Sequence, residues 1–244
     1  MNPENEVIQP NPNVTIDSVP PKSLFRDIVG IVAAPGETFN RILKIGYWGG
    51  VFVLILITAG ILQQIYHSEL IDYTVQKLQE RASQSEQNLQ GAMDFYSKET
   101  ITRPLYLFIT LAGQIIYILI GAILYFFIGS IIFGGTARFK HVWIVACWAY
   151  IIELIGLIFK TPLILTKHTM EAGLNFGLIF SESLVGNKLN KLLSLVDIFG
   201  IWHLVVAGIG LAVLYKFSTG KGIAISFISW IIVIAVSGAL VMIS

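Results

Sequence analysis

Cysteine and charge are both scarce in this chain of 244 residues. The sequence contains one cysteine, Cys147, and 13% of its residues are charged, whereas about a quarter are charged in an average soluble domain. One cysteine excludes an intramolecular disulfide, and no CxxC motif or Cys/His cluster indicates zinc. We therefore expect Cys147 to be a small apolar core residue, and we expect no metal or other cofactor.

Several functional signals are also missing. The formal net charge of +1 argues against nucleic acid as a partner. The amino-terminal segment has no basic start followed by an apolar core, so a signal peptide is not predicted. HExxH and GxSxG motifs are absent, and the STGKG stretch at 218–222 lacks the glycine and the Ser/Thr that a phosphate-binding loop requires. We therefore predict that the protein is not an enzyme.

Hydrophobic residues make up 55% of the chain and gather in long runs. A transmembrane helix needs about 20 predominantly apolar residues. The runs of that length lie at roughly 46–66, 104–133, 142–162, 195–216 and 221–243. The sequence thus predicts an all-α membrane protein, in which short amphipathic interfacial helices precede a bundle of five transmembrane helices in the lipid bilayer.

The segments outside the runs differ in character. Residues 1–22 are polar and rich in proline, which predicts a disordered tail. Residues 23–45 place apolar side chains on one helical face on each side of a break at Pro35-Gly36, with the charged residues Arg26, Asp27, Glu37 and Arg41 mainly off that face. This pattern predicts two short amphipathic helices, which either lie in the membrane interface or pack against the bundle.

Residues 67–103 form a predicted helical insertion between the first two runs. Apolar and small residues recur at alternating steps of four and three, a weak heptad pattern. Two alternatives fit it: a self-packed hairpin that turns near Gly91 and returns to Pro104, or a coiled coil that binds a partner.

Basic residues near the ends of the runs predict the orientation. Arg41, Lys44, Arg138, Lys140, Lys216 and Lys221 all lie on the side of the amino terminus if there are five spans. Because Lys and Arg favour the cytoplasmic side, we expect a cytoplasmic amino terminus, an external carboxyl terminus and an extracytoplasmic 67–103 insertion.

Three polar residues of different spans are predicted to share one depth. At a rise of about 1.5 Å per residue, Glu153 lies about 18 Å from the cytoplasmic face, and His203 and Gln114 lie about 14 and 15 Å from the outer face. They form a polar layer near the middle of the membrane. Its members either satisfy each other by hydrogen bonds or form a path for protons or ions.

Two further sets of residues have predicted structural roles. The same arithmetic places Lys160 and Asp197 near the outer boundary, within reach of an ion pair. Small residues let membrane helices approach closely. We expect helix packing at Gly113, Gly121, Gly129 and Gly208.

Some of these stretches resemble a known family. A Gly-Gly-x-x-Arg-Phe turn at 134–139 leads into a span containing CWAY, and IWHLVVAGIGLAVLYKFSTGKGIA at 201–224 joins the last two spans by a short basic loop. With the amphipathic helices and their central proline, this order resembles the Yip1 domain family, in its prokaryotic branch, over about residues 23–243. The resemblance implies five spans and a cytoplasmic amino terminus.

The resemblance also bears on partners. Eukaryotic members associate with Rab GTPases and form hetero-oligomers, and they carry an Asp-Leu-Tyr-Gly-Pro motif before the first span. The corresponding stretch here is RILKIGYWGG, which shares only Gly46-Tyr47 with that motif.

Two functions remain open from the sequence. The first is a non-enzymatic protein that organises the membrane or serves as a scaffold for other membrane proteins or for further copies of itself. The alternative is a transporter or channel for a small solute, protons or ions that uses the Glu153, His203 and Gln114 layer. The expected location is a bacterial or archaeal cytoplasmic membrane.

Overall fold

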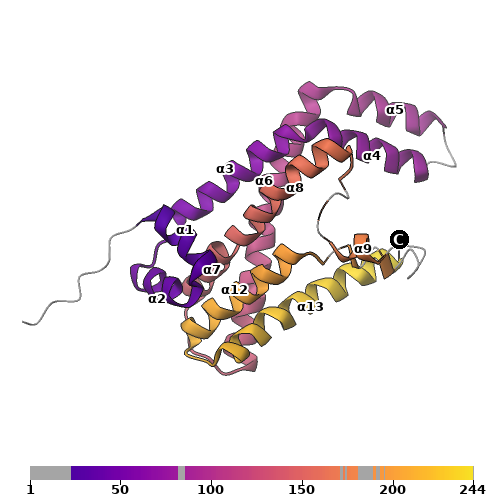
Figure 1. Cartoon of the computed structure of the whole chain (residues 1–244). Coiled ribbons are helices and arrows are strands. Elements are labelled where there is room, and N and C mark those ends of the chain that lie inside the picture. The colour runs from indigo at the N-terminus through magenta and orange to yellow at the C-terminus, as the bar shows by residue number, and fades with distance from the viewer. Residues whose placement is uncertain are drawn as a thin grey trace, which may run out of the picture.

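The chain folds into a bundle of α-helices. The computed structural model describes residues 23–81, 86–170, 173, 175–180, 189–190, 193–194 and 196–243. The long elements in these ranges are all helices (Figure 1). The predicted tail, residues 1–22, lies outside the described residues.

Four helical segments of the described chain are long and apolar enough to cross a membrane. They are α6 (Glu99–Phe126) with the π-helical turn η1 (Phe127–Ile132), α7 (Phe139–Ala149) with α8 (Ile151–Lys167), α12 (Ile198–Tyr215), and the first part of α13 (Thr219–Ile243). A fifth results if α2 (Pro35–Ile45) and α3 (Gly49–Ile65), which meet at a bend of 116°, count as one broken span. The chain is therefore an all-α integral membrane protein with four to five spanning segments.

Proline does not end helices where the sequence analysis places an end. Pro162 lies inside α8, which continues to Lys167. Membrane helices tolerate proline because neighbouring helices, hydroxyl groups and small local adjustments satisfy the freed backbone groups. The carbonyl that loses its usual backbone donor at Pro162 is that of Ile158, four residues earlier. Similarly, α6 begins at Glu99, so that Pro104 lies within the helix rather than at its start.

The 67–103 region contains a helical hairpin. α4 (His67–Arg81) and α5 (Glu86–Tyr96) lie side by side at one end of the bundle (Figure 1). Gly91 is inside α5, so the predicted turn near Gly91 is wrong. We refer to this end of the molecule as the hairpin end.

The first two helices cover the opposite end of the bundle. α1 (Leu24–Ala33) and α2 contact each other, and α2 packs against α7 and α12 (Figure 1). Phe39 and Ile42 of α2 are fully buried in the core. We call this the α1–α2 end; the loop from η1 to α7 and the turn from α12 to α13 also lie there.

Side chains between the helices are buried, and many apolar side chains on the outer surface of the bundle are exposed. Trp148 of α7 is fully buried, and its indole N–H donates to the carbonyl of Tyr47 at 3.0 Å. Cys147 is also buried, and its thiol is free. Large apolar side chains remain exposed on α3, α6 and α13. Such a surface is compatible with hydrocarbon but not with water.

Candidate functional site: a polar layer between the helices

Glu153 and His203 meet inside the bundle. Glu153 is on α8 and His203 is on α12, and a Glu153 Oε1 lies 3.2 Å from His203 Nδ1. The His203 side chain is 6% exposed and the Glu153 side chain 21% exposed. The carboxylate is therefore within hydrogen-bonding distance of the imidazole and also borders open space.

Gln114 reaches this pair only through Tyr150. The Tyr150 hydroxyl donates a hydrogen bond to Oε1 of Gln114, and the Tyr150 ring stands edge-on to the His203 ring with centroids 6.1 Å apart. Tyr150 links α7 to α8 and was not among the residues selected from the sequence. Its spacing of three from Glu153, which places the two on one helical face, is the sequence signal for it.

Lys160 and Asp197 form an ion pair. Lys160 Nζ lies 2.5 Å from Asp197 Oδ2, and their side chains are 26% and 15% exposed. Asp197 also caps α12, because its Oδ1 accepts from the N–H of Gly200 at 2.9 Å. Any Cβ at Gly200 would lie 3.6 Å from Glu153 Oε1 and 3.7 Å from Asp197 Oδ1. The ion pair and the Glu153–His203 pair are thus neighbours.

A polar cavity joins these groups. It has a volume of about 120 Å³ and lies between α3, α6 and α8. Gln114, Tyr150, Glu153 and Lys160 supply its polar lining. A cavity needs only about 10–15 Å³ of this kind of volume to hold one water molecule, so several water molecules fit beside the Glu153 carboxylate.

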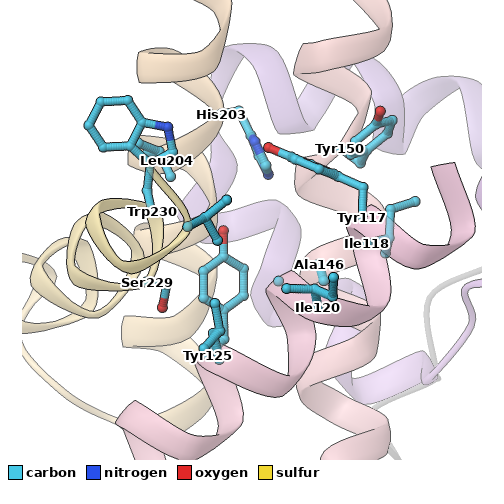
Figure 2. A pocket seen from close by; sticks show the side chains of 13 residues that line it. Tyr117, Ile118, Ile120, Tyr125, Ala146, Tyr150, His203, Leu204, Ser229 and Trp230 are labelled. Carbon is cyan, nitrogen blue, oxygen red and sulfur yellow. The ribbon is translucent and has the colours of Figure 1, made fainter. Parts of the chain in front are cut away.

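On the other side of His203 lies an apolar groove. It is formed by α6, α7, α12 and α13 and holds about 90 Å³. Figure 2 shows the Tyr117 hydroxyl pointing toward His203, while Tyr125 lies deeper among apolar side chains. His203 and Tyr150 border the groove, so the polar layer separates an apolar space from the polar cavity.

The buried polar atoms of the layer are satisfied. Within the described ranges, every buried side-chain nitrogen or oxygen atom has a hydrogen-bond partner, and no group of three or more His, Cys, Asp or Glu residues there is arranged to hold a metal ion. The arrangement can therefore stabilise the bundle as it stands, and it can also hold a proton between Glu153 and His203.

A second charged cluster lies at the α1–α2 end and was missed by the sequence analysis. Asp27 of α1 is fully buried. It accepts hydrogen bonds from Arg41 of α2, through Nε at 2.9 Å and through a second guanidinium nitrogen, and from the hydroxyl of Tyr47. The sequence pattern places Asp27 and Arg41 mainly off the apolar face of their helices, yet the two residues pair inside the fold, where their charges neutralise each other.

Tyr47 connects this cluster to the rest of the bundle. Its hydroxyl donates a hydrogen bond to the Asp27 carboxylate. The Tyr47 ring also packs edge-on against Trp148, with centroids 5.2 Å apart, which ties the cluster to α7.

A third polar network lies at the hairpin end. His67 is almost completely buried and joins Gln63 of α3 to Thr102 of α6, at 3.2 Å from each. Burial, and then the Arg103 charge, lower the pKa of His67 below its ordinary value. A neutral imidazole therefore links the first two long helices of the bundle.

The four selected glycines fall into two kinds. A Cβ at Gly208 would lie 2.5 Å from the Cα of Ile223 on α13, and one at Gly129 would lie 2.5 Å from the ring of Tyr215. These two positions are at close helix contacts. A Cβ at Gly113 or Gly121 would meet nothing within 4 Å, so neither glycine is at a close contact with another helix in the part of the chain that the structure describes.

The comparisons with known proteins give one match. The sequence model described as the Yip1 domain matches residues 29–240. No curated protein and no solved structure matches the chain. The matched range includes the polar layer, the network at the hairpin end and all of the spanning segments, and it begins two residues after Asp27.

Proposed function

Because this chain belongs to the Yip1 domain family, we propose that it is a non-enzymatic membrane protein that organises the bilayer through its first helices. The observation that carries this proposal is the surface of α1. Phe25 is 80% exposed and Val29, one turn further on, is 49% exposed. An apolar stripe of this kind on an amphipathic helix inserts into the boundary between head groups and acyl chains.

The attachment of α1 supports the same proposal. An inserted helix displaces lipid effectively only if it cannot rotate its apolar face away. The Asp27–Arg41–Tyr47 cluster fixes α1 to α2 and to the start of α3, and α2 is packed on the bundle. The bundle therefore holds the stripe of Phe25 and Val29 in a constant orientation.

The side of the membrane follows from charge. Arg41, Lys44, Arg138, Lys140, Lys216 and Lys221 belong to the α1–α2 end. The excess of Lys and Arg near span ends favours the cytoplasm. We propose that this end is cytoplasmic and that the membrane is the cytoplasmic membrane of a bacterium or archaeon. The partners are then the inner-leaflet lipids and other membrane proteins or further copies of the chain.

Vesicle reconstitution tests this function. We expect the full chain to reduce the diameter of liposomes or to form tubules, as seen by electron cryomicroscopy at a fixed protein-to-lipid ratio. The double variant Phe25→Ser/Val29→Ser should lose most of this effect, because burial of apolar side chains drives the insertion.

The matched control is Phe95→Ser. Phe95 is an exposed aromatic residue of α5, at the hairpin end. This variant should remodel vesicles like the unaltered protein. Equal remodelling by the double variant and the unaltered chain would reject the proposal, and chemical cross-linking in native membranes would then be the route to its partners.

The polar cavity favours a second candidate, a proton or small-solute transporter. It brings space for water to a carboxylate that is hydrogen-bonded to a histidine near mid-membrane, and intramembrane ionisable groups commonly serve in relays. This candidate predicts that proteoliposomes with an imposed pH gradient conduct protons and that Glu153→Gln lowers the flux by at least about tenfold, because the amide cannot exchange a proton.

A carboxylate outside the layer provides the comparison. Glu99→Gln removes an exposed negative charge that pairs with Arg103, one helix turn further on, and it should leave any proton flux unchanged. If Glu153→Gln conducts as well as the unaltered chain, or if neither conducts, transport through this layer is excluded.

A further inference from the structure

A broad cavity opens at the α1–α2 end, away from the polar layer. It has a volume of about 630 Å³ and lies between the end of α6, η1, the loop that follows η1, α7 and α12. Neither of the functions proposed above uses it. Its lining combines basic, hydroxyl and apolar groups.

Two basic side chains line this cavity and no acidic residue does. They are Arg138 and His141, and the hydroxyls of Ser130 and Thr136 lie on the same lining. The structure gives Arg138 no ion pair with any described residue. A guanidinium without a carboxylate partner, beside hydroxyl groups, matches the geometry of a phosphate.

The nearby lysine is already engaged. Lys221 lies over the ring of Phe217, with its Nζ 3.9 Å from the ring centroid. It also donates to the carbonyl of Phe133 at 3.4 Å. Among the residues that line the cavity, Arg138 is therefore the one whose side chain always carries a positive charge.

The loop that forms the cavity rim has a fixed shape. Gly134 has φ of 69°, a conformation that side chains other than glycine rarely adopt. A Cβ at Gly135 would lie 2.3 Å from the ring of Tyr215, and the Gly135 N–H donates to the carbonyl of Gly129 at 2.9 Å. The two glycines allow the loop to pack closely against Tyr215 of α12. Arg138 then lies directly before the first residue of α7.

The apolar part of the lining indicates an amphipathic ligand. Phe126 and Leu214 border the cavity beneath its polar groups. On η1, the neighbouring Phe127, Ile131 and Ile132 are exposed toward the surroundings of the bundle. A ligand with its anionic group at Arg138 would therefore have an apolar surface beside it for its acyl chains.

We propose that this cavity binds the phosphate of an anionic phospholipid head group from the leaflet at the α1–α2 end. Arg138 bonds the phosphate oxygens, Ser130 and Thr136 offer hydroxyls to it, and the η1 surface contacts the acyl chains. Basic pockets between membrane helices commonly hold such head groups. The inference stands whether or not α1 remodels membranes.

Native mass spectrometry of the full chain in detergent tests the proposal. With equal amounts of phosphatidylglycerol and phosphatidylcholine added, we expect adducts of phosphatidylglycerol to dominate. Arg138→Gln should reduce the population of these adducts about fivefold, the effect of one basic residue at an anionic lipid. Arg138→Lys should fall between the two, because lysine keeps the charge but loses the bidentate geometry.

Lys140→Gln is the control with the same change in charge. Lys140 is exposed on α7 two residues from Arg138 and does not line the cavity. The proposal fails if Lys140→Gln weakens phosphatidylglycerol binding as much as Arg138→Gln does, since the attraction would then be general. It also fails if phosphatidylcholine binds equally well, or if millimolar inorganic phosphate or glycerol 3-phosphate binds at Arg138 while the lipid does not. Thermal unfolding of each variant confirms that it is folded.

Discussion

Replacing Asp27 with alanine should lower the free energy of unfolding by about 3–5 kcal/mol, because it leaves the Arg41 charge without its buried partner. Asp27 is fully buried, and Arg41 is 22% exposed. The Tyr47 hydroxyl also loses its acceptor. In thermal unfolding of the detergent-solubilised chain, we expect the midpoint to fall by about 10 °C.

An exposed pair of the same chemistry provides the control. Glu99→Ala removes the carboxylate that Arg103 Nε contacts at 2.9 Å, where the side chains are 63% and 40% exposed. Exposed pairs contribute about 0–1 kcal/mol, so this variant should unfold almost like the unaltered chain. An Asp27→Ala midpoint equal to that of Glu99→Ala would contradict a structural role for the cluster.

The double variant Asp27→Ala/Arg41→Met separates two causes. If the cost arises from the orphaned charge, replacing Arg41 with an apolar side chain should restore part of the stability lost in Asp27→Ala, since the two sites are not additive. If the cost arises from lost packing of α1, the double variant should be less stable than either single variant.

The second large effect is expected at the contact between α12 and α13. Gly208→Ala places a methyl group 2.5 Å from the Cα of Ile223 and 2.8 Å from its backbone nitrogen. Backbone atoms cannot move aside as the end of a side chain can, so the two helices must separate. We expect a loss of about 1–3 kcal/mol, the usual cost of overpacking, measured in the same thermal unfolding experiment.

Gly113→Ala makes the same chemical change on an open helix face. A Cβ at Gly113 meets nothing within 4 Å, and alanine favours a helix over glycine by about 1 kcal/mol. This variant should therefore be as stable as the unaltered chain or more stable. Destabilisation by Gly113→Ala of the same size as by Gly208→Ala would show that α6 contacts a second copy or another protein in the membrane.

The polar layer shows which features of a site can be predicted from the sequence. A constant rise per residue is enough to place Glu153 and His203 at one depth, and their side chains lie 3.2 Å apart. Gln114 has a similar predicted depth, yet it bonds Tyr150 instead. Rise fixes the height of a residue but not the rotation of its helix about its axis, and only packing against neighbouring helices sets that rotation.

Helix ends illustrate the same limit. Pro104 and Pro162 are natural helix boundaries when each segment is considered alone. Within the bundle, α6 begins before Pro104 and α8 continues past Pro162. Neighbouring groups in a packed bundle lower the cost of a proline in a membrane helix, and the pattern of apolar residues along the sequence does not record them.

The sequence by itself determined the class of protein. Long apolar runs with little charge cannot remain in water, and in hydrocarbon the backbone must satisfy its own hydrogen bonds, so the runs become membrane helices. The order of those helices and the family follow from the same runs and the loops between them. None of this depends on how the helices turn toward one another.

Only the tertiary structure decided which residues meet. Asp27 and Arg41 are 14 residues apart on two helices. Arg138 borders a cavity that the end of α6, η1, α7 and α12 enclose together with the loop between η1 and α7. Gly208 and Gly113 are both glycines of long apolar helices. A Cβ at Gly208 would meet the backbone of Ile223, whereas one at Gly113 would meet no described residue within 4 Å. Contacts of this kind depend on the rotation and spacing of packed helices, which arise when the whole bundle assembles.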